Sequence, residues 1–378
     1  MLKNKPMKTR PSLGILVALL FSLPGLAQQT YQPISVLNVE IDTIPVSFPE
    51  QEQFKNDVTG NTVKVLHAVE NTGFQFYNSV SFRNDKEGII AGGTRLRLRS
   101  TQDGGKHWKG FSFSGFANAF YSTAIYENQF YVVGASRYIF RNDDLNTEWE
   151  AFDVNTLGES KYALRHPKFY KIKFSPSGFG IIVGDNNGKP LVLKTTDKGA
   201  HWKKVKLNGL QTDEVSLSDV FIFPDDTIRL LSFTGNVYES SNEGKDWSLL
   251  RRGKEGESLN SIAFATKKEG YISGLQGLLL KTTDGGKTWE QIDTTVLGRG
   301  ANISNLEYTK DHRLLLTTAE SFQDEKNNAP IFSIDKEGKI SPFLSAKGQT
   351  FVFDAYGLFL LNDNVFLLDR DKLYKIKV

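Results

Sequence analysis

The sequence predicts an all-β chain that folds as a single β-propeller, and three observations support this prediction. All five tryptophans stand at the last position of the same eight-residue phrase. Successive copies lie 41, 53, 45 and 42 residues apart, which is the length of one four-stranded propeller blade. Each period contains short runs rich in β-branched and aromatic residues, separated by Gly, Asn and Asp.

The repeated phrase predicts the turn of a β-hairpin. It has Ser, Thr or Asn first, Asp or Asn third, Gly or Asn fifth and Trp last. The Asp or Asn side chain can bond backbone amides of its own turn, and Gly, or Asn146, tolerates a positive φ. The Trp covers the turn with an apolar face. The residues to which we assign these structural roles are Thr101, Asp103, Gly105 and Trp108; Asp144 and Trp149; Thr195, Asp197, Gly199 and Trp202; Ser240, Asn242, Gly244 and Trp247; and Thr282, Asp284, Gly286 and Trp289.

The phrase resembles the Asp-box, or BNR repeat, of sialidases, xyloglucanases, sortilin-type receptors and photosystem II stability/assembly factors. The stretch 269–289 is most similar to the last of these families, which pairs a short glycine-bounded strand with an Asp-box in each blade. Residues 87–92 and 178–184 show the same pattern before the first and third boxes. The resemblance covers residues 74–292 and implies a propeller that binds a protein. In that family a basic surface patch is implicated in binding a client membrane protein.

We expect seven blades, with six or eight as the alternatives. The fourth and fifth boxes are followed by a box without Trp at Ser333–Gly338. Strand-like runs then continue to the C-terminus, and Val63–His67 can pair with the last blade to close the ring, which removes unpaired edges. The expected strands of the last blade are Phe351–Phe353, Leu358–Leu361, Val365–Leu368 and Leu373–Ile376. The expected blade starts lie near Phe74, Phe113, Tyr170, Val215, Ser258, Ala301 and Gln349.

The first 27 residues predict a secretory signal peptide. Four basic residues precede the apolar run Gly14–Leu23, and Pro24–Ala27 supplies small residues before a cut at Gln28. The apolar run is too short for a comfortable membrane span. We therefore expect an exported protein, periplasmic or secreted, with a signal peptide at 1–27, an extended lead-in at 28–62 and the propeller at 63–378.

Composition argues against several classes of function. Without the leader, 42 basic residues stand against 43 acidic ones, so there is no general case for nucleic acid binding. Cysteine is absent, which excludes disulfides and thiolate chemistry. The five histidines lack metal-ligand spacing and no phosphate or dinucleotide motif is present, so we expect no metal and no cofactor. The Arg-Ile-Pro motif of sialidases is also missing.

One basic run is the candidate binding surface. Arg95, Arg97 and Arg99 alternate with two leucines, and the period of a strand puts the three guanidinium groups on one face. Such a face could bind an anion or an acidic partner, because Arg suits carboxylates and phosphates. Alternatively, the arginines pair with acids on the next blade or reach solvent at the rim.

Two hypotheses on function remain. The first is a monomeric, non-catalytic propeller that binds a protein partner as an assembly or stability factor or as a scaffold. The alternative is a carbohydrate-active glycoside hydrolase on the same scaffold, because fold does not settle function. Two carboxylates about 5–9.5 Å apart across the central channel would favour the hydrolase. A featureless or basic channel mouth would favour the binder.

Overall fold

Most of the chain beyond residue 60 is described. The computed structural model describes residues 30–33, 39–42, 53–55, 57–58, 60–68, 77–93, 98–113, 117, 119–158, 164, 166–319, 329–344, 355–369 and 372–377. The predicted signal peptide at 1–27 therefore lies outside the described residues.

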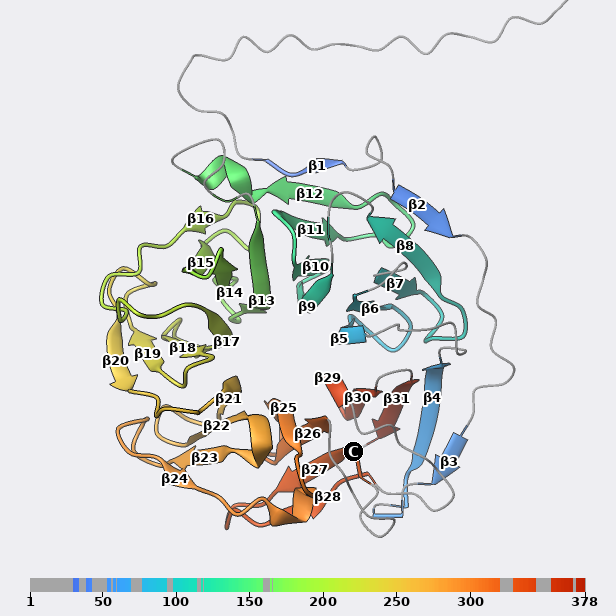
Figure 1. Cartoon of the computed structure of the whole chain (residues 1–378). Coiled ribbons are helices and arrows are strands. Elements are labelled where there is room, and N and C mark those ends of the chain that lie inside the picture. Colours follow the sequence, from blue (N-terminus) through green and yellow to red (C-terminus); the bar gives the residue numbers. More distant parts are fainter. Residues whose placement is uncertain are drawn as a thin grey trace, which may run out of the picture.

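Seven antiparallel sheets form a closed ring, which confirms the predicted seven-bladed β-propeller (Figure 1). The innermost strands are β5 (Tyr77–Phe82), β9 (Phe120–Tyr126), β13 (Pro167–Phe174), β17 (Leu217–Ile222), β21 (Leu259–Phe264), β25 (Asn302–Tyr308) and β29 (Ala355–Leu361). The second strands are β6 (Gly88–Gly92), β10 (Gln129–Gly134), β14 (Gly180–Asn186), β18 (Ile228–Ser232), β22 (Gly270–Gly274), β26 (Leu314–Ala319) and β30 (Asn364–Asp369).

The outer half of each blade is less regular. The third strands are β7 (Leu98–Thr101), β11 (Tyr138–Asn142), β15 (Pro190–Thr195), β19 (Val237–Ser240), β23 (Leu279–Thr282), β27 (Ile331–Ile334) and β31 (Lys372–Lys377). The fourth strands are β8 (Lys109–Phe113), β12 (Glu150–Asp153), β16 (Lys203–Lys204), β20 (Ser248–Arg251), β24 (Glu290–Gln291), β28 (Ile340–Pro342) and β4 (Thr62–Ala68). In the described part of the chain, three short 3-10 helices lie in connections: η1 (Val154–Leu157), η2 (Leu275–Gly277) and η3 (Thr295–Leu297).

The N-terminal strand β4 closes the ring. It pairs antiparallel with β31, with Val63 opposite Ile376 and His67 opposite Leu373, as predicted from the sequence. The last blade therefore takes its fourth strand from the N-terminal part of the chain. The expected strand at 351–353 lies outside the described residues.

Three further strands come from the predicted lead-in and add to outer blade edges. β3 (Gln53–Lys55) pairs with β4, β2 (Val39–Asp42) with β8 and β1 (Gln32–Pro33) with β12. The described strands of the lead-in thus extend the outer edges of three neighbouring blades (Figure 1).

One predicted blade boundary is wrong. Phe113 was expected near the start of the second blade, but it ends β8, the fourth strand of the first. The second blade starts at Phe120, and both rings are fully buried 5.4 Å apart. The prediction was wrong because the aromatic residues around Phe113 and Phe120 come from two different blades and pack against each other in the interface between them.

The Asp-box turns join the third and fourth strands. In the first box the Thr101 hydroxyl accepts from the Gly105 amide at 2.8 Å and donates to the Asp103 carboxylate at 3.0 Å. The same carboxylate oxygen accepts from the His107 amide at 3.0 Å. The third, fourth and fifth boxes repeat these bonds, and the fifth-position glycine of all four has φ between +79° and +91°. This left-handed conformation is the reason for glycine there.

The second box departs from this geometry. Asn146 was expected to adopt a positive φ, but it does not. Instead its amide donates to Asp144 Oδ1 at 3.0 Å, and the Thr147 amide donates to the Asp144 carbonyl at 2.8 Å. The Asp144 carboxylate therefore accepts from the amide two residues on, whereas the carboxylates of Asp103 and Asp197 accept from the amide four residues on.

The box tryptophans fill the interfaces between blades. Each of the five packs with its own blade and the preceding one. In the sixth blade the Trp position holds Ile340, which is 7 % exposed and packs in the same kind of interface. Asp335 of this worn box still accepts from the Lys339 amide at 2.8 Å. Each box therefore serves two purposes: its polar residues, with glycine where it is present, form the hairpin turn, and its last residue packs between two blades.

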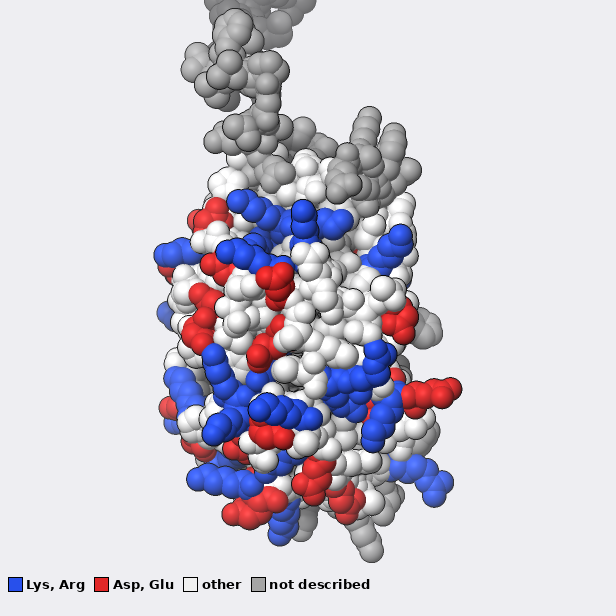
Figure 2. Space-filling model, turned by 90° about the vertical axis from the view of Figure 1, so that its left-hand side faces the viewer, with Lys and Arg blue, Asp and Glu red and all other residues white. Residues whose placement is uncertain are grey.

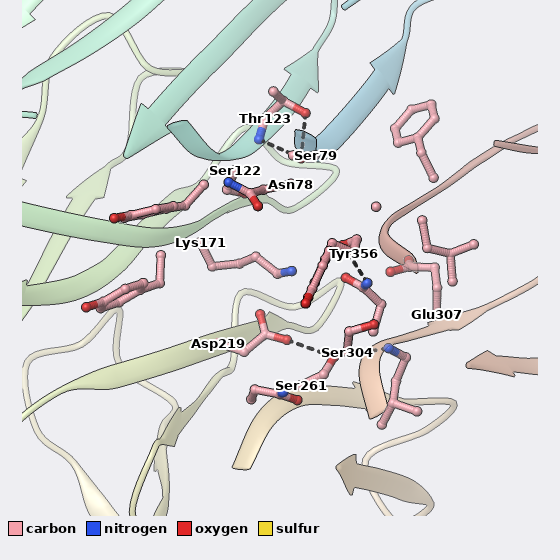
Figure 3. Close-up of a pocket in the computed structure, with 18 of the residues that line it drawn as sticks. Asn78, Ser79, Ser122, Thr123, Lys171, Asp219, Ser261, Ser304, Glu307 and Tyr356 are labelled. Atoms are coloured by element: carbon pink, nitrogen blue, oxygen red, sulfur yellow. Dashed lines mark hydrogen bonds between the residues drawn. The ribbon is translucent and has the colours of Figure 1, made fainter. Parts of the chain in front are cut away.

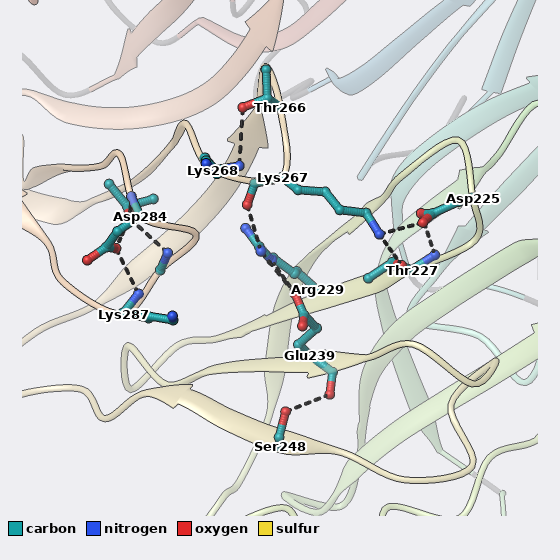
Figure 4. Close-up of polar contacts among 12 residues, drawn as sticks. Asp225, Thr227, Arg229, Glu239, Ser248, Thr266, Lys267, Lys268, Asp284 and Lys287 are labelled. Carbon is teal, nitrogen blue, oxygen red and sulfur yellow. Dashed lines mark hydrogen bonds and ion pairs between the residues drawn. The ribbon is translucent and has the colours of Figure 1, made fainter.

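Cations also link neighbouring blades on the face of the Asp-box turns. Arg229 of β18 donates to Glu239 at 2.9 Å and to the Lys267 carbonyl of the next blade at 3.0 Å (Figure 4). Burial lowers the pKa of Arg229, and Glu239 offsets part of this effect. Lys267 reaches back to Asp225 and Thr227 of the preceding blade. Arg229 thus links an acid of its own blade to a backbone carbonyl of the next blade.

The carboxylate of the fifth box has a strongly lowered pKa. Hydrogen bonds from the hydroxyl and amide of Thr288, with others from Thr282 and Lys287, lower the pKa of Asp284 to about 2. An unfolded Asp titrates near pH 3.9. Because the folded-state pKa is the lower one, this carboxylate contributes stability above about pH 4, and the contribution is lost as the pH falls towards 2.

We predict that Asp284→Asn flattens the acid side of the stability profile. Asn242 occupies the same position in the fourth box and accepts equivalent bonds, so the variant should keep the turn at pH 7. Urea unfolding at pH 5, 4, 3 and 2.5 should show the difference between wild type and variant shrinking as the pH falls. Glu255→Gln is the control, because Glu255 is exposed and has no bonded partner in the described part of the chain. Equal changes in both variants would contradict the assignment.

Candidate functional site

The central channel is lined by the innermost strands of all seven blades. It encloses about 500 Å³. Each innermost strand carries a β-bulge near its start, and the bulged residue lines the channel. Bulges re-aim side chains and are frequent beside functional sites. The seven bulged residues are Asn78, Tyr121, Tyr170, Ser218, Asn260, Ser304 and Tyr356.

In several blades the side chain of the residue after the bulge forms a hydrogen bond with the backbone of the next blade. Ser79 Oγ accepts from the Thr123 amide at 3.0 Å, and Ser122 Oγ accepts from the Ile172 amide at 3.3 Å. On the opposite side of the ring, Asp219 accepts from the Ile262 amide at 3.1 Å and Ser261 accepts from the Leu306 amide at 3.1 Å. A short acceptor at this position therefore satisfies a backbone amide of the following blade.

Lys171 breaks this pattern in the third blade. An ammonium group has no acceptor to offer, and the amide that it would serve, Val220, donates instead to Asp219 of its own blade at 2.8 Å. Among the described residues Lys171 has no hydrogen-bond or ion-pair partner, and it is only partly exposed. Figure 3 shows its side chain extending into the channel.

An aromatic cluster borders Lys171. The rings of Tyr121 and Tyr170 stack 5.5 Å apart, and Phe233 meets Tyr170 edge-on at 5.2 Å. The Tyr170 hydroxyl donates to Asp185 at 3.0 Å. Burial and then the Asp185 carboxylate raise the pKa of both tyrosines, so they stay neutral hydroxyls. All three rings line the channel and offer an apolar surface with polar rims.

Among the described residues two carboxylates line the channel, and both are engaged. Asp219 is 1 % exposed and accepts from two backbone amides and from Ser261. Glu307 pairs with Lys173 at 3.3 Å. Burial alone would lower the pKa of Lys173, but Glu307 and Asp219 outweigh it and raise the pKa. A glycoside hydrolase needs one carboxyl free to deliver a proton, and an oxygen held by backbone amides is poorly placed to do so.

The predicted arginine strip is described only in part. Arg99 is 6 % exposed, and its guanidinium lies 5.9 Å from the centre of the Tyr77 ring. At this position the geometry fits packing within the blade rather than a surface contact. Arg95 and Arg97 lie outside the described residues.

Two histidines of the Asp-boxes pair with box aspartates. His107 Nδ1 lies 2.6 Å from Asp103, and His201 Nδ1 lies 2.7 Å from Asp197. Within the described ranges, no three His, Asp or Glu side chains gather as metal ligands. The described part of the chain also contains no helix with the length and hydrophobicity needed to cross a bilayer.

One side of the outer rim mixes both signs of charge. Figure 2 shows lysines and arginines interspersed with acids on the side of the ring that carries β16 and β20. Lys203 and Lys204 are exposed on the edge strand β16. Charged side chains on an edge discourage pairing with a foreign strand, so this rim is a less suitable docking surface than the channel.

A closed ring of blades, with Asp-box turns between their third and fourth strands, defines the class: the chain is a seven-bladed Asp-box β-propeller. The profile of the family described as photosynthesis system II assembly factor YCF48 matches residues 117–260. The chloroplastic photosystem II stability/assembly factor HCF136 of Oryza sativa subsp. japonica is 24 % identical over 290 residues, which span 67 % of this chain and 68 % of that protein. The resemblance drawn from the Asp-box repeats is thereby confirmed.

Solved structures confirm the fold. One described as YCF48 bound to D1 peptide has a TM-score of 0.59 at 14 % identity and covers 88 % of this chain and 98 % of that one. AFV00434, an ancestral GH74 enzyme, has a TM-score of 0.61 at 14 % identity and covers 82 % of this chain and 45 % of the enzyme. A binding protein and an enzyme thus share this architecture, so the site has to decide the function.

Proposed function

We propose that this chain is an exported, non-catalytic propeller that binds a protein partner, as an assembly or stability factor or as a scaffold. The observation that carries the proposal is the chemistry of the channel. Both lining carboxylates are held by protein groups, while the Lys171 ammonium and three aromatic rings face the open space. Such a surface is suited to recognition and lacks a free acid–base pair. The likeness to photosystem II assembly factors, one of them described with a bound peptide, supports the same choice.

The proposed layout is a signal peptide at 1–27, a lead-in at 28–62 and a monomeric propeller at 63–378, in the periplasm or outside the cell. The basic, apolar and small-residue order at the N-terminus supports export. Mass spectrometry of the exported protein should show Gln28 at the N-terminus. Intact Met1 in a cytosolic fraction would contradict export.

In-cell crosslinking followed by affinity purification of the full-length chain tests the binding role. We expect one protein to be recovered reproducibly, and the assembled complex that contains it to decline when the chain is deleted. A deletion that leaves every complex at its normal level would overturn the role in assembly or stability.

The hydrolase alternative is tested on the same purified protein. Aryl glycosides and β-glucan oligosaccharides should not be turned over. Hydrolysis that Glu307→Gln abolishes, with the melting temperature unchanged, would establish the enzyme and overturn the non-catalytic proposal.

A further inference from the structure

We infer that the central channel holds the C-terminal end of a polypeptide, with its carboxylate on Lys171. This inference rests on the proposed function, a protein partner. It goes further by naming which part of the partner enters, and where.

The first step concerns Lys171. A partly buried charge normally has a counter-charge or hydrogen-bond partners, and Lys171 has none in the described part of the chain. Its neighbours cannot supply one. Asp219 serves backbone amides of two blades, Glu307 pairs with Lys173, and Asp185 accepts from Tyr170 and Ser216.

Blade packing does not account for this lysine. Ser79, Ser122 and Ser261 occupy the equivalent position, and the hydroxyl of each accepts a hydrogen bond from a backbone amide of the next blade. At the third blade the Val220 amide donates to Asp219 of its own blade instead, so this amide does not need Lys171. The ammonium is therefore available for an external anion.

A second polar group in the channel is also unmet. Asn260 is the bulged residue of β21, and its Oδ1 is buried without a donor among the described residues. The channel thus offers one cation and one acceptor. A peptide end supplies the matching pair, a carboxylate and an amide N–H, and the Tyr121–Tyr170–Phe233 cluster can cover an apolar side chain.

The shape of the ring selects a chain end. Because β4 closes the propeller, a ligand can enter the channel only along its axis. A loop would need room for two chain segments side by side, whereas about 500 Å³ is the size of a small-ligand site. A single terminus fits this space, and the positive charge selects the C-terminus over the N-terminus.

Peptide binding to the full-length chain tests the inference. A library of tetrapeptides with free C-terminal carboxylates is passed over the protein, and the retained peptides are measured by isothermal titration calorimetry. Their C-terminally amidated forms should bind at least about tenfold more weakly, because a charge-assisted hydrogen bond is lost. Lys171→Gln should produce a similar loss, and Lys171→Arg should restore binding.

The control variant is Lys168→Gln. Lys168 lies on the same strand, is exposed and does not line the channel, so binding should be unchanged. Lys171→Gln should melt at the wild-type temperature, because no bond within the described chain is removed. A wild-type melt together with undiminished peptide binding would overturn the inference.

Other outcomes are equally decisive. If the protein retains no peptide, the chain-end assignment is overturned. The same holds if acetate is the only carboxylate that the protein binds. Equal binding of amidated peptides that carry an internal Glu would overturn it in favour of an acidic side chain. If the captured partner binds Lys171→Gln normally, the channel inference fails and the proposed function stands. If no partner is captured at all, the proposed function fails.

Discussion

Trp202→Ala is expected to destabilise the propeller by about 3–5 kcal/mol, the range for truncating a large buried aromatic side chain. Trp202 is fully buried between the second and third blades, where it meets Phe174 edge-on at 6.0 Å. Its ring N–H donates to the Tyr31 hydroxyl at 2.8 Å. Urea unfolding followed by circular dichroism should show a lower midpoint with the same spectrum before unfolding.

Two further variants separate the causes of this loss. Trp289→Ala removes the same residue type from a box in which it is less buried, so its cost should be smaller. Tyr31→Phe keeps the ring against Phe152 but removes the acceptor for Trp202, which should cost about 1–3 kcal/mol. If Trp202→Ala unfolds at the wild-type urea concentration, the Asp-box tryptophans do not hold the blades together.

The fold was predictable because its signals are local and repeated. A turn that needs an acceptor at one position and a glycine at φ near +85° leaves the same residues in each copy, as at Thr195, Asp197 and Gly199. The spacing of these turns then sets the blade length and count. The closing strand was predictable for a different reason, because Val63–His67 is a strand-like run with no partner before the first blade.

The candidate site could not be predicted in the same way. Its residues come one or two at a time from seven strands, and the bulged positions hold Asn, Tyr and Ser without a common type. Lys171 stands among other lysines on β13, and nothing local distinguishes it from Lys168. Lys171 could be recognised from the sequence only after the sequences of the seven blades had been aligned with one another at their bulged residues. The residue after the bulge then accepts a hydrogen bond from the next blade in the first, second, fourth and fifth blades. It is an asparagine that donates to the Tyr356 carbonyl in the sixth blade and a lysine in the third.

Val63→Asp is expected to open the ring and to cost about 4 kcal/mol or more, because it buries an unpaired charge. Val63 is fully buried and packs with Tyr374 and Ile376 of β31, the strand that β4 must hold. The measurement is urea unfolding together with size-exclusion chromatography. Loss of β4 exposes the edge of β31, and an unpaired edge promotes association, so the variant should also elute as oligomers.

Lys64→Asp is the matched control for ring closure. It places the same carboxylate one residue further along β4, where the period of the strand directs the side chain to solvent. Its stability should stay within about 0.5 kcal/mol of wild type, as for other exposed substitutions. The pair separates a general effect of negative charge on β4 from the loss of its packing. If both variants remain monomeric and equally stable, pairing of β4 with β31 does not hold the ring closed, and a channel that opens sideways would also admit a loop in place of a chain end.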